Sequence, residues 1–259
     1  MAALKPITLI TGASAGIGAA LAHQFASNRH ELVLVARRAA QLNELAGTIE
    51  TRGLPRPQIV VADLTRGDAP ALIADELRAR GLEPNFVVNN AGFGLLGTAA
   101  ELDRAEQLAM IDLNARALTD LSLRFVDSLA RHRGGILNVA SVAGFMPGPG
   151  LAVYYATKAY VLSFSEALHH ELKPKGIRVT TLCPGPVATE FQNRAGMPKG
   201  YFPSMLDRSA ERVAREGYQG LMAGRRVVIP GFPNRVAAFL PRLAPRGIVL
   251  AVMNRFRKR

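Results

Sequence analysis

Short apolar runs alternate with longer stretches of helical period along most of this chain. The apolar runs have the length of strands and cover residues 7–11, 31–36, 58–62, 85–90, 135–141, 177–183 and 226–230. Helix-length stretches between them cover 16–28, 39–52, a segment ending near 80, a long region to about 132, and 154–173. Strands that are apolar on both faces are typical of a parallel sheet covered by helices. The sequence therefore predicts an α/β fold with one doubly wound parallel sheet of about seven strands and helices on both faces.

The length of the chain fits one such sheet. Its 259 residues are enough to bury a large core, and no repeat or linker divides them. We therefore expect a single domain over residues 1–259. Its longest irregular insertion, 184–206, follows a strand end, where open α/β sheets bind ligands, and the part over about 189–206 is interpreted as a substrate-side lid. A basic C-terminal extension is expected over about 231–259.

Cysteine and histidine give no support for a metal site. Cys183 is the only cysteine, so neither an internal disulfide nor a four-cysteine zinc site can form, and we expect it to be a buried apolar residue. His169 and His170 are adjacent on a predicted helix and point to different sides. The N-terminus runs into a strand without a signal-peptide pattern, so a cytoplasmic location is predicted.

Positive charge is concentrated in the C-terminal extension. Residues 225–259 contain nine Arg or Lys and no Asp or Glu, out of a formal net charge of +12. The longest apolar run there, residues 247–253, falls short of the roughly 20 residues of a membrane span. Peripheral contact with an anionic membrane, a cover over the substrate cleft, and packing on the same domain or on another subunit all stay open. Nucleic-acid binding is not expected, because the arginines lack interleaved aromatic residues.

A glycine turn, TGASAGIG at 11–18, follows the first strand and opens the first helix. Gly12, Gly16 and Gly18 allow a tight turn that aims a helix N-terminus at a pyrophosphate. Ser14 can cap the helix or donate to phosphate. Ordinary strand-to-helix punctuation is the alternative, but the position in the first β-turn-α unit favours a dinucleotide site.

The end of the second strand indicates which dinucleotide the chain binds. A site for NAD usually has Asp or Glu there, whereas this chain has Ala36 followed by Arg37 and Arg38. Two cations can pair with a 2′-phosphate, although both can also simply begin a solvated helix. We expect NADP(H).

Polar residues also follow the third and fourth strands. Asp63 is placed either to hydrogen-bond an adenine amino group or to cap a helix over residues 65–80. Asn90, within NNAG at 89–92, is expected to satisfy neighbouring backbone groups rather than to act as a catalyst.

The stretch VYYATKAY, residues 153–160, pairs tyrosine with lysine on a helix. Tyr154 lies four residues before Lys158, and Tyr155 three before it, so spacing alone leaves both open. A phenol can give a proton to an alkoxide or take one from an alcohol, but its ordinary pKa is about 10. We expect the lysine cation to lower that pKa, and a shift of roughly three units requires about 4 kcal/mol.

Together these segments resemble the short-chain dehydrogenase/reductase family nearly from end to end. The elements that match in order and spacing are TGASAGIG, NNAG, Asn114, Ser141, the Tyr154-x-x-x-Lys158 pair and PGPVAT at 184–189. The resemblance implies a Rossmann fold and NADP(H)-dependent interconversion of a carbonyl and an alcohol. It selects Tyr154 over Tyr155, because Ser141 precedes Tyr154 by 13 residues, close to the family spacing.

The resemblance also implies roles for individual residues. Tyr154 becomes the acid/base, and Ser141 donates to the substrate carbonyl. Lys158 holds the nicotinamide ribose, and Asn114 supports a water that relays protons. The structural alternatives are a locally bonded serine, a surface lysine and an asparagine in backbone contacts. The implied cofactor contacts are Gly12, Ser14, Gly16, Ile17, Gly18, Arg37, Arg38, Asp63, Leu64, Asn90, Ala91, Gly92, Tyr154, Lys158, Pro184, Gly185, Val187 and Thr189.

The substrate is predicted to be an apolar ketone, aldehyde or alcohol. Besides Ser141, the expected substrate contacts are Phe93, Phe145 and Phe191, with further apolar wall residues Met146, Leu151, Val153, Met197, Tyr201, Phe202 and Met205. A homo-oligomer is expected. The alternative hypothesis is a dinucleotide-binding regulatory protein, or a lipid-associated protein at a membrane surface, that uses the basic C-terminal segment.

Overall fold

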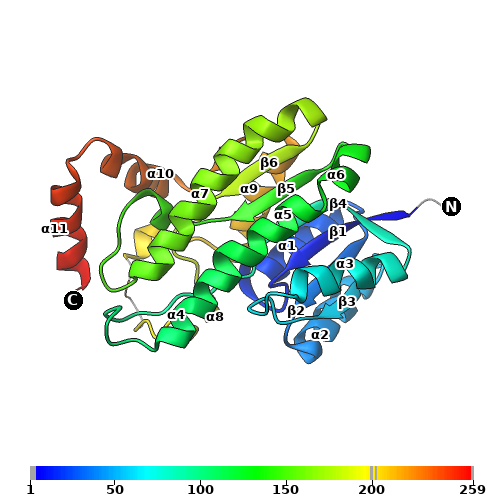
Figure 1. Ribbon diagram of the computed structural model, residues 1–259, viewed down its shortest axis with the longest axis horizontal. Coiled ribbons are helices and arrows are strands. Elements are labelled where there is room, and N and C mark those ends of the chain that lie inside the picture. Colours follow the sequence, from blue (N-terminus) through cyan, green and yellow to red (C-terminus); the bar gives the residue numbers. More distant parts are fainter. Residues whose placement is uncertain (1–3, 199–200, 202, 258–259) are drawn as a thin grey trace.

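The computed structural model of the protein describes residues 4–198, 201 and 203–257, so Phe202 lies outside the described residues. Its centre is a parallel seven-stranded sheet in the order β3-β2-β1-β4-β5-β6-β7 (Figure 1). The predicted doubly wound sheet is therefore confirmed. The strands are β1 (Lys5–Thr11), β2 (Leu32–Ala36), β3 (Gln58–Val61), β4 (Leu82–Asn89), β5 (Gly135–Val139), β6 (Arg178–Leu182) and β7 (Val227–Val228).

Helices cover both faces of the sheet (Figure 1). One face packs against α1 (Gly16–Ser27), α2 (Ala39–Glu50) and α9 (Ala210–Met222). The other packs against α3 (Ala69–Ala79), α5 (Leu118–Arg124), α6 (Val126–Arg131) and α7 (Ala152–Leu172). The remaining helices are α4 (Arg104–Ile111), α8 (Glu190–Arg194), α10 (Phe232–Phe239) and α11 (Arg246–Arg257), with short 3₁₀ turns at 142–145, 173–175, 204–206 and 240–242.

Alternation of side chains along the strands explains the two cores. In β1, Ile10 enters the core under α1, whereas Leu9 enters the core under α7. In β2, Leu34 likewise enters the first of these cores and Val33 the second. Because successive strand residues point to opposite faces, a strand without polar positions is stable only where helices cover both sides.

Two predicted helical regions differ from the structure. The third helix begins at Ala69 and has Asp68 at its N-cap, with Pro70 in the first turn, a position that suits the fixed φ of proline. Asp63 instead accepts hydrogen bonds from the backbone N–H and the hydroxyl of Thr65, so the alternative in which it caps a helix from residue 65 is wrong. The long region to about 132 consists of α4, a π-helical stretch at 112–117, α5 and α6.

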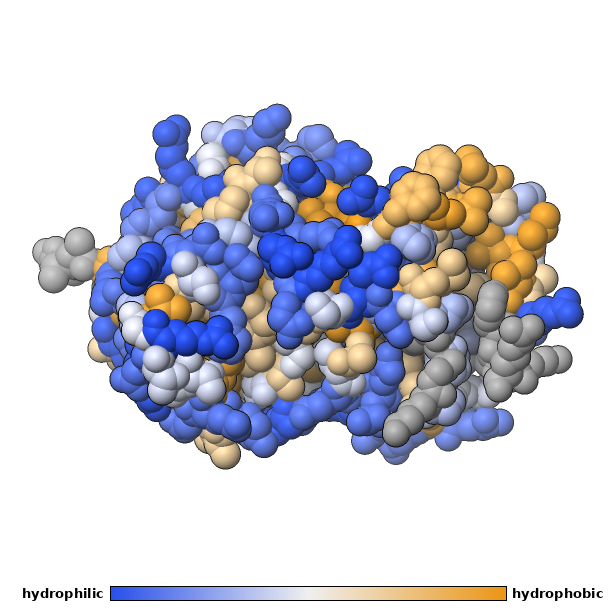
Figure 2. Space-filling model, turned by 180° about the vertical axis from the view of Figure 1, so that it is seen from behind, coloured by the Kyte–Doolittle hydropathy of each residue, from blue (hydrophilic) through white to orange (hydrophobic). Residues whose placement is uncertain are grey.

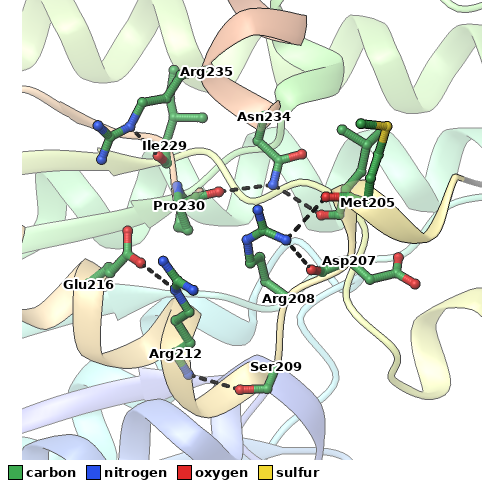
Figure 3. A network of polar contacts seen from close by, with 11 residues as sticks. Met205, Asp207, Arg208, Ser209, Arg212, Glu216, Ile229, Pro230, Asn234 and Arg235 are labelled. Atoms are coloured by element: carbon green, nitrogen blue, oxygen red, sulfur yellow. Dashed lines mark hydrogen bonds and ion pairs between the residues drawn. The ribbon is translucent and has the colours of Figure 1, made fainter. Parts of the chain in front are cut away.

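The C-terminal helices α10 and α11 lie at one end of the molecule, far from the N-terminal end of β1 (Figure 1). Asn234 fixes α10 in place (Figure 3). Its side-chain amide is fully buried and donates to the carbonyls of Leu206, at 3.1 Å, and Pro230, at 2.9 Å. A Cβ added to Gly185 would lie 2.2 Å from the Asn234 Oδ1 atom. One side chain thus holds α10 against both the 204–206 turn and the loop after β6.

No helix in the described part of the chain is long and apolar enough to cross a membrane.

Candidate active site

The carboxyl ends of the central strands open into a cavity of about 1000 Å³. It collects segments that are far apart in the sequence, from the glycine turn to α11. The predicted residues that line it are Gly12, Ser14, Gly16, Ile17, Arg37, Arg38, Asp63, Leu64, Asn90, Ala91, Gly92, Ser141, Tyr154, Lys158, Pro184, Gly185, Val187, Thr189 and Phe191.

Backbone forms the wall at the glycine turn. A Cβ on Gly12, which has φ +64°, would lie 2.7 Å from the Cα of Ala91. Gly18 lies beneath the turn rather than at the cavity, and its Cβ would lie 2.2 Å from the carbonyl oxygen of Gly12. The N-terminus of α1 has no side-chain cap, so its free N–H groups are available to an anion. This cradle fits a pyrophosphate, and Ser14 does not cap the helix.

Charged side chains surround the next part of the cavity. Arg38 donates from Nη2 to Ser14 Oγ at 3.2 Å and to Glu190 Oε2 at 2.8 Å. Arg37 Nη1 lies 3.8 Å from Asp63 Oδ2. Both arginines are exposed at the start of α2, and both line the cavity.

Arg194 of α8 is a third cation at this end, and the sequence analysis missed it. Its guanidinium lies 4.2 Å from the ring centroid of Phe93. Burial, and then the charge of Arg37, lowers the pKa of Arg194. Partial burial raises the pKa of Asp63, but hydrogen bonds from Thr65 and the nearby cations outweigh this effect and lower it. No spacing rule links Arg194 to Arg37, because they lie far apart in the chain and meet only through the fold.

Ser141, Tyr154 and Lys158 meet at the other side of the cavity. The Ser141 hydroxyl faces Tyr154 and acts to lower the pKa of its phenol. Ser141 Oγ also accepts from the N–H of Ala143 at 3.1 Å and donates to the carbonyl of Pro184 at 3.4 Å. The serine therefore makes local bonds as well as facing the tyrosine.

Lys158 is 5% exposed, and its Nζ donates to the carbonyl of Val139 at 2.8 Å, so it is not a surface lysine. Burial lowers the pKa of Lys158 to about 8. Burial also raises the pKa of Tyr154 to about 12, and the bond with Ser141 only partly opposes this. The expected lowering of the tyrosine pKa by the lysine is therefore wrong for this structure, because desolvation prevails and the Nζ atom lies 5.8 Å from the tyrosine ring centroid.

Asn114 lies in the π-helical stretch and is fully buried. Its amide nitrogen donates to the carbonyl of Phe93 at 2.9 Å and to the hydroxyl of Thr157 at 3.1 Å. Its Oδ1 atom accepts from the N–H of Phe93 at 3.1 Å. The side chain joins the loop after β4 to α7, the helix that carries Tyr154 and Lys158.

Asn90 contacts the glycine turn, as expected. Its amide donates to the carbonyls of Thr11 at 3.0 Å and Gly12 at 3.1 Å. Asn90 therefore holds the turn against the end of β4.

Tyr155, the other tyrosine that spacing allowed as the partner of Lys158, also lines the cavity. Its ring meets that of Tyr154 edge to face at 6.1 Å, and burial raises its pKa. Tyr160 instead bonds to the hydroxyl of Thr119 on the outer side of α7.

The substrate end of the cavity is apolar. Phe93 and Phe145 do not line it, because their rings pack against Arg194 and Arg242, the latter at 5.1 Å. The C-terminal segment, which the sequence left without an assigned position, supplies much of this wall. The apolar lining residues are Met146, Leu151, Tyr155, Phe191, Met197, Tyr201, Leu206, Ala237, Leu240, Ile248, Val249, Val252 and Met253.

In the described part of the chain, no group of three or more His, Cys, Asp or Glu side chains could hold a metal ion. Cys183 is free and fully buried, as expected, and His169 hydrogen-bonds to the carbonyl of Val179 at 2.7 Å.

The fold and the site define a Rossmann-type oxidoreductase that uses a nicotinamide dinucleotide. The chain belongs to the short-chain dehydrogenase family, since the model of that family matches residues 6–199.

Known proteins agree with this assignment. Sulfoacetaldehyde reductase 2 from Chromohalobacter salexigens is 37% identical over 191 residues, which are 73% of this chain and 75% of that protein. A short-chain dehydrogenase from Sphingobium yanoikuyae, solved in complex with NADPH, is 34% identical with a TM-score of 0.81 and covers 96% and 95% of the two chains. The bulky-bulky ketone specific alcohol dehydrogenase from Comamonas testosteroni is 31% identical with a TM-score of 0.75 and covers 89% and 88%.

Proposed function

We propose that the protein is an NADP(H)-dependent oxidoreductase that interconverts a carbonyl and an alcohol on an apolar substrate, with Tyr154 as the acid/base. One observation carries the proposal. A single cavity joins the glycine turn and the two arginines after β2 to Ser141, Tyr154 and an apolar wall.

The cofactor end favours NADP(H) over NAD(H). The glycine turn would hold the pyrophosphate, and Arg37 and Arg38 would hold the 2′-phosphate that only NADP(H) carries. NADPH, when bound, supplies the hydride. The NADPH in the Sphingobium yanoikuyae structure supports the same choice.

Ser141 and Tyr154 would share the substrate oxygen. The Ser141 hydroxyl would donate to the carbonyl oxygen as negative charge develops on it. Because burial raises the pKa of Tyr154 to about 12, the phenol is protonated at neutral pH and ready to give its proton to the alkoxide. Lys158, charged below its pKa of about 8, would hold the nicotinamide ribose. The reverse reaction needs the phenolate first, so we expect it to be favoured at higher pH.

The apolar wall favours an apolar substrate over a charged one. Among the described lining residues, the cations are Arg37, Arg38, Arg194 and Lys158, and none belongs to the wall formed by α10 and α11. A sulfonate like that of sulfoacetaldehyde would find no arginine there. The ketone preference in the name of the Comamonas testosteroni enzyme fits the wall better.

Turnover by two tyrosine variants tests the proposal. NADPH oxidation is followed with a panel of bulky ketones and aldehydes. Tyr154→Phe should lower kcat by about 10²- to 10⁴-fold, the range for loss of a general acid. Tyr155→Phe removes the same atom from a neighbouring wall residue and is the matched control. Equal turnover in Tyr154→Phe and the wild type would remove the catalytic assignment. NADPH binding without turnover on any substrate would favour the regulatory alternative.

The whole chain would act as one domain in the cytoplasm, with the 189–206 segment as its lid. A homo-oligomer fits the exposed apolar residues on the outer sides of α4, α5 and α7, which are Leu108, Ile111, Leu123 and Tyr160. Sedimentation velocity measures the mass of the particle, and a monomer at micromolar concentration would contradict the oligomer.

A further inference from the structure

Large apolar side chains are exposed on α10, α11 and the turn between them. Figure 2 shows apolar surface gathered at this end of the molecule, whereas the rest of that face is largely hydrophilic. Phe232, at 75%, and Leu243, at 70%, are the most exposed large apolar residues described. We call this surface the C-terminal apolar face, and it consists of Phe232, Val236, Phe239, Leu240, Leu243, Ile248, Leu250 and Val252.

The charge around this face is positive and unpaired. Arg235, Arg242, Arg246 and Arg255 are exposed there, and the sequence from 225 to 259 contains no carboxylate side chain. Among the described side chains, no residue from 231 to 255 takes part in an ion pair. A partner for this face therefore needs an apolar layer and negative charge beside it.

The C-terminal apolar face is continuous with the rim of the cavity. Leu240, Ile248 and Val252 are 56%, 57% and 49% exposed, and each also lines the cavity. These three apolar side chains therefore connect the C-terminal apolar face with the wall of the cavity.

We propose that the C-terminal apolar face docks on an anionic lipid surface and that apolar substrate enters the cavity from that side. Lipid headgroups supply the negative charge next to an apolar layer. A second copy of this chain fits less well, because a two-fold contact would bring the arginines of both copies together without any carboxylate from this segment. The proposed docking depends only on the apolar and charged residues of this surface, whereas the proposed entry of substrate rests on the proposed function.

Vesicle flotation of the full chain tests the docking without any turnover. The probes are phosphatidylcholine vesicles and vesicles of equimolar phosphatidylcholine and phosphatidylglycerol. We expect the chain to bind the anionic vesicles, and binding to fall as salt is added. Arg246→Gln should weaken binding about fivefold, the factor for one surface cation near anionic lipid.

Leu243→Glu should weaken binding at least about tenfold, because it removes an inserted side chain and adds repulsion. Leu72→Glu is the matched control, since Leu72 is 57% exposed on α3 at a distance from this face. The control should bind vesicles like the wild type. NADPH binding by each variant shows that it is folded.

Three results would overturn the docking. The first is a wild type that does not float with anionic vesicles at low salt. The second is an equal loss of vesicle binding in Leu243→Glu and Leu72→Glu. The third is a Leu243→Glu variant that binds vesicles normally and changes only the mass of the particle in sedimentation. The last result would assign the face to a second copy. NADPH-dependent turnover that persists in any of these cases leaves the proposed function standing.

Discussion

At the glycine turn the cavity wall is backbone, whereas at α10 and α11 it is apolar side chain. Around Gly12 and Gly18, an added Cβ would come within 2.7 Å and 2.2 Å of main-chain atoms. At the opposite end, Leu240 and Ile248 are more than half exposed and have room to change. The cofactor end therefore tolerates almost no change in volume, whereas the substrate end can vary in size and shape. Substitutions at the two ends should differ in effect accordingly.

The largest effect is expected at Gly18. Gly18→Ala would force the carbonyl of Gly12 to move and so distort the turn. We expect the Kd for NADPH to rise at least about 100-fold, or roughly 3 kcal/mol. Fluorescence titration with NADPH measures it. Gly47→Ala is the control, because that helical glycine has only the end of a flexible arginine near its Cβ position, at 3.9 Å. If Gly18→Ala bound NADPH normally, the close packing of the turn would be irrelevant to the cofactor.

Lys158→Met should stabilise the protein while it removes turnover. Since burial lowers the lysine pKa from 10.5 to about 8, the folded state bears the cost of a buried charge below pH 8. The variant should gain up to about 3 kcal/mol in free energy of unfolding at pH 7. The gain should shrink as pH rises from 8 to 10.5. In this range the lysine of the folded protein has lost its proton, so the folded state no longer contains a buried charge. Thermal unfolding across this range checks the sign, and a gain that grew with pH would contradict it.

Arg37→Ala should mainly change the choice of cofactor. Loss of one cation beside a phosphate costs about 1.5 to 3 kcal/mol, so NADPH affinity should fall by about 10- to 100-fold, with little change for NADH. Parallel titrations with both dinucleotides measure the ratio. Arg56→Ala is the control, because Arg56 pairs with Glu50 at the other end of α2. Equal losses for both dinucleotides would assign Arg37 a structural role.

Glu190→Gln should act in the opposite direction and more weakly. Glu190 of α8 holds Arg38 in an exposed ion pair at 2.8 Å, so it competes with a 2′-phosphate for that arginine. Removing the charge should tighten NADPH binding by about two- to fivefold, as expected for a surface pair. The effect should vanish in the Arg38→Ala background. A gain that survived there would show that Glu190 acts through another group.

The smallest effect is expected at the apolar wall. Leu240→Ala shortens a side chain that is already 56% exposed, so it leaves no closed void. KM for an apolar ketone should change by less than about fivefold, with kcat and NADPH affinity unaffected. Steady-state kinetics measures all three, and a large loss of NADPH affinity would contradict the division of the cavity into two ends.

The sequence predicted what is local and missed what depends on distant packing. The positions of the strands and of the glycine turn follow from periodicity and spacing, and both patterns extend over only a few residues. Arg194 and Glu190 gave no signal, because α8 reaches the arginines after β2 only through the fold. Phe93 was predicted as a substrate wall but its ring is turned toward Arg194, a choice of rotamer that sequence cannot specify. The raised pKa of Tyr154 was likewise missed, because burial is a property of the assembled site.

The anchoring of α10 by Asn234 has a consequence for how such a protein diversifies. A contiguous stretch that includes α10 and α11 supplies one wall of the cavity, and it is joined to the sheet at Gly231. Asn234 ties it to the segment after β6 through a hydrogen bond to the carbonyl of Leu206 and close packing on Gly185. If that anchor is kept, the stretch beyond it can be exchanged as a unit by recombination or by design. New substrate ranges can then arise on a conserved nucleotide-binding frame without refashioning the chemistry.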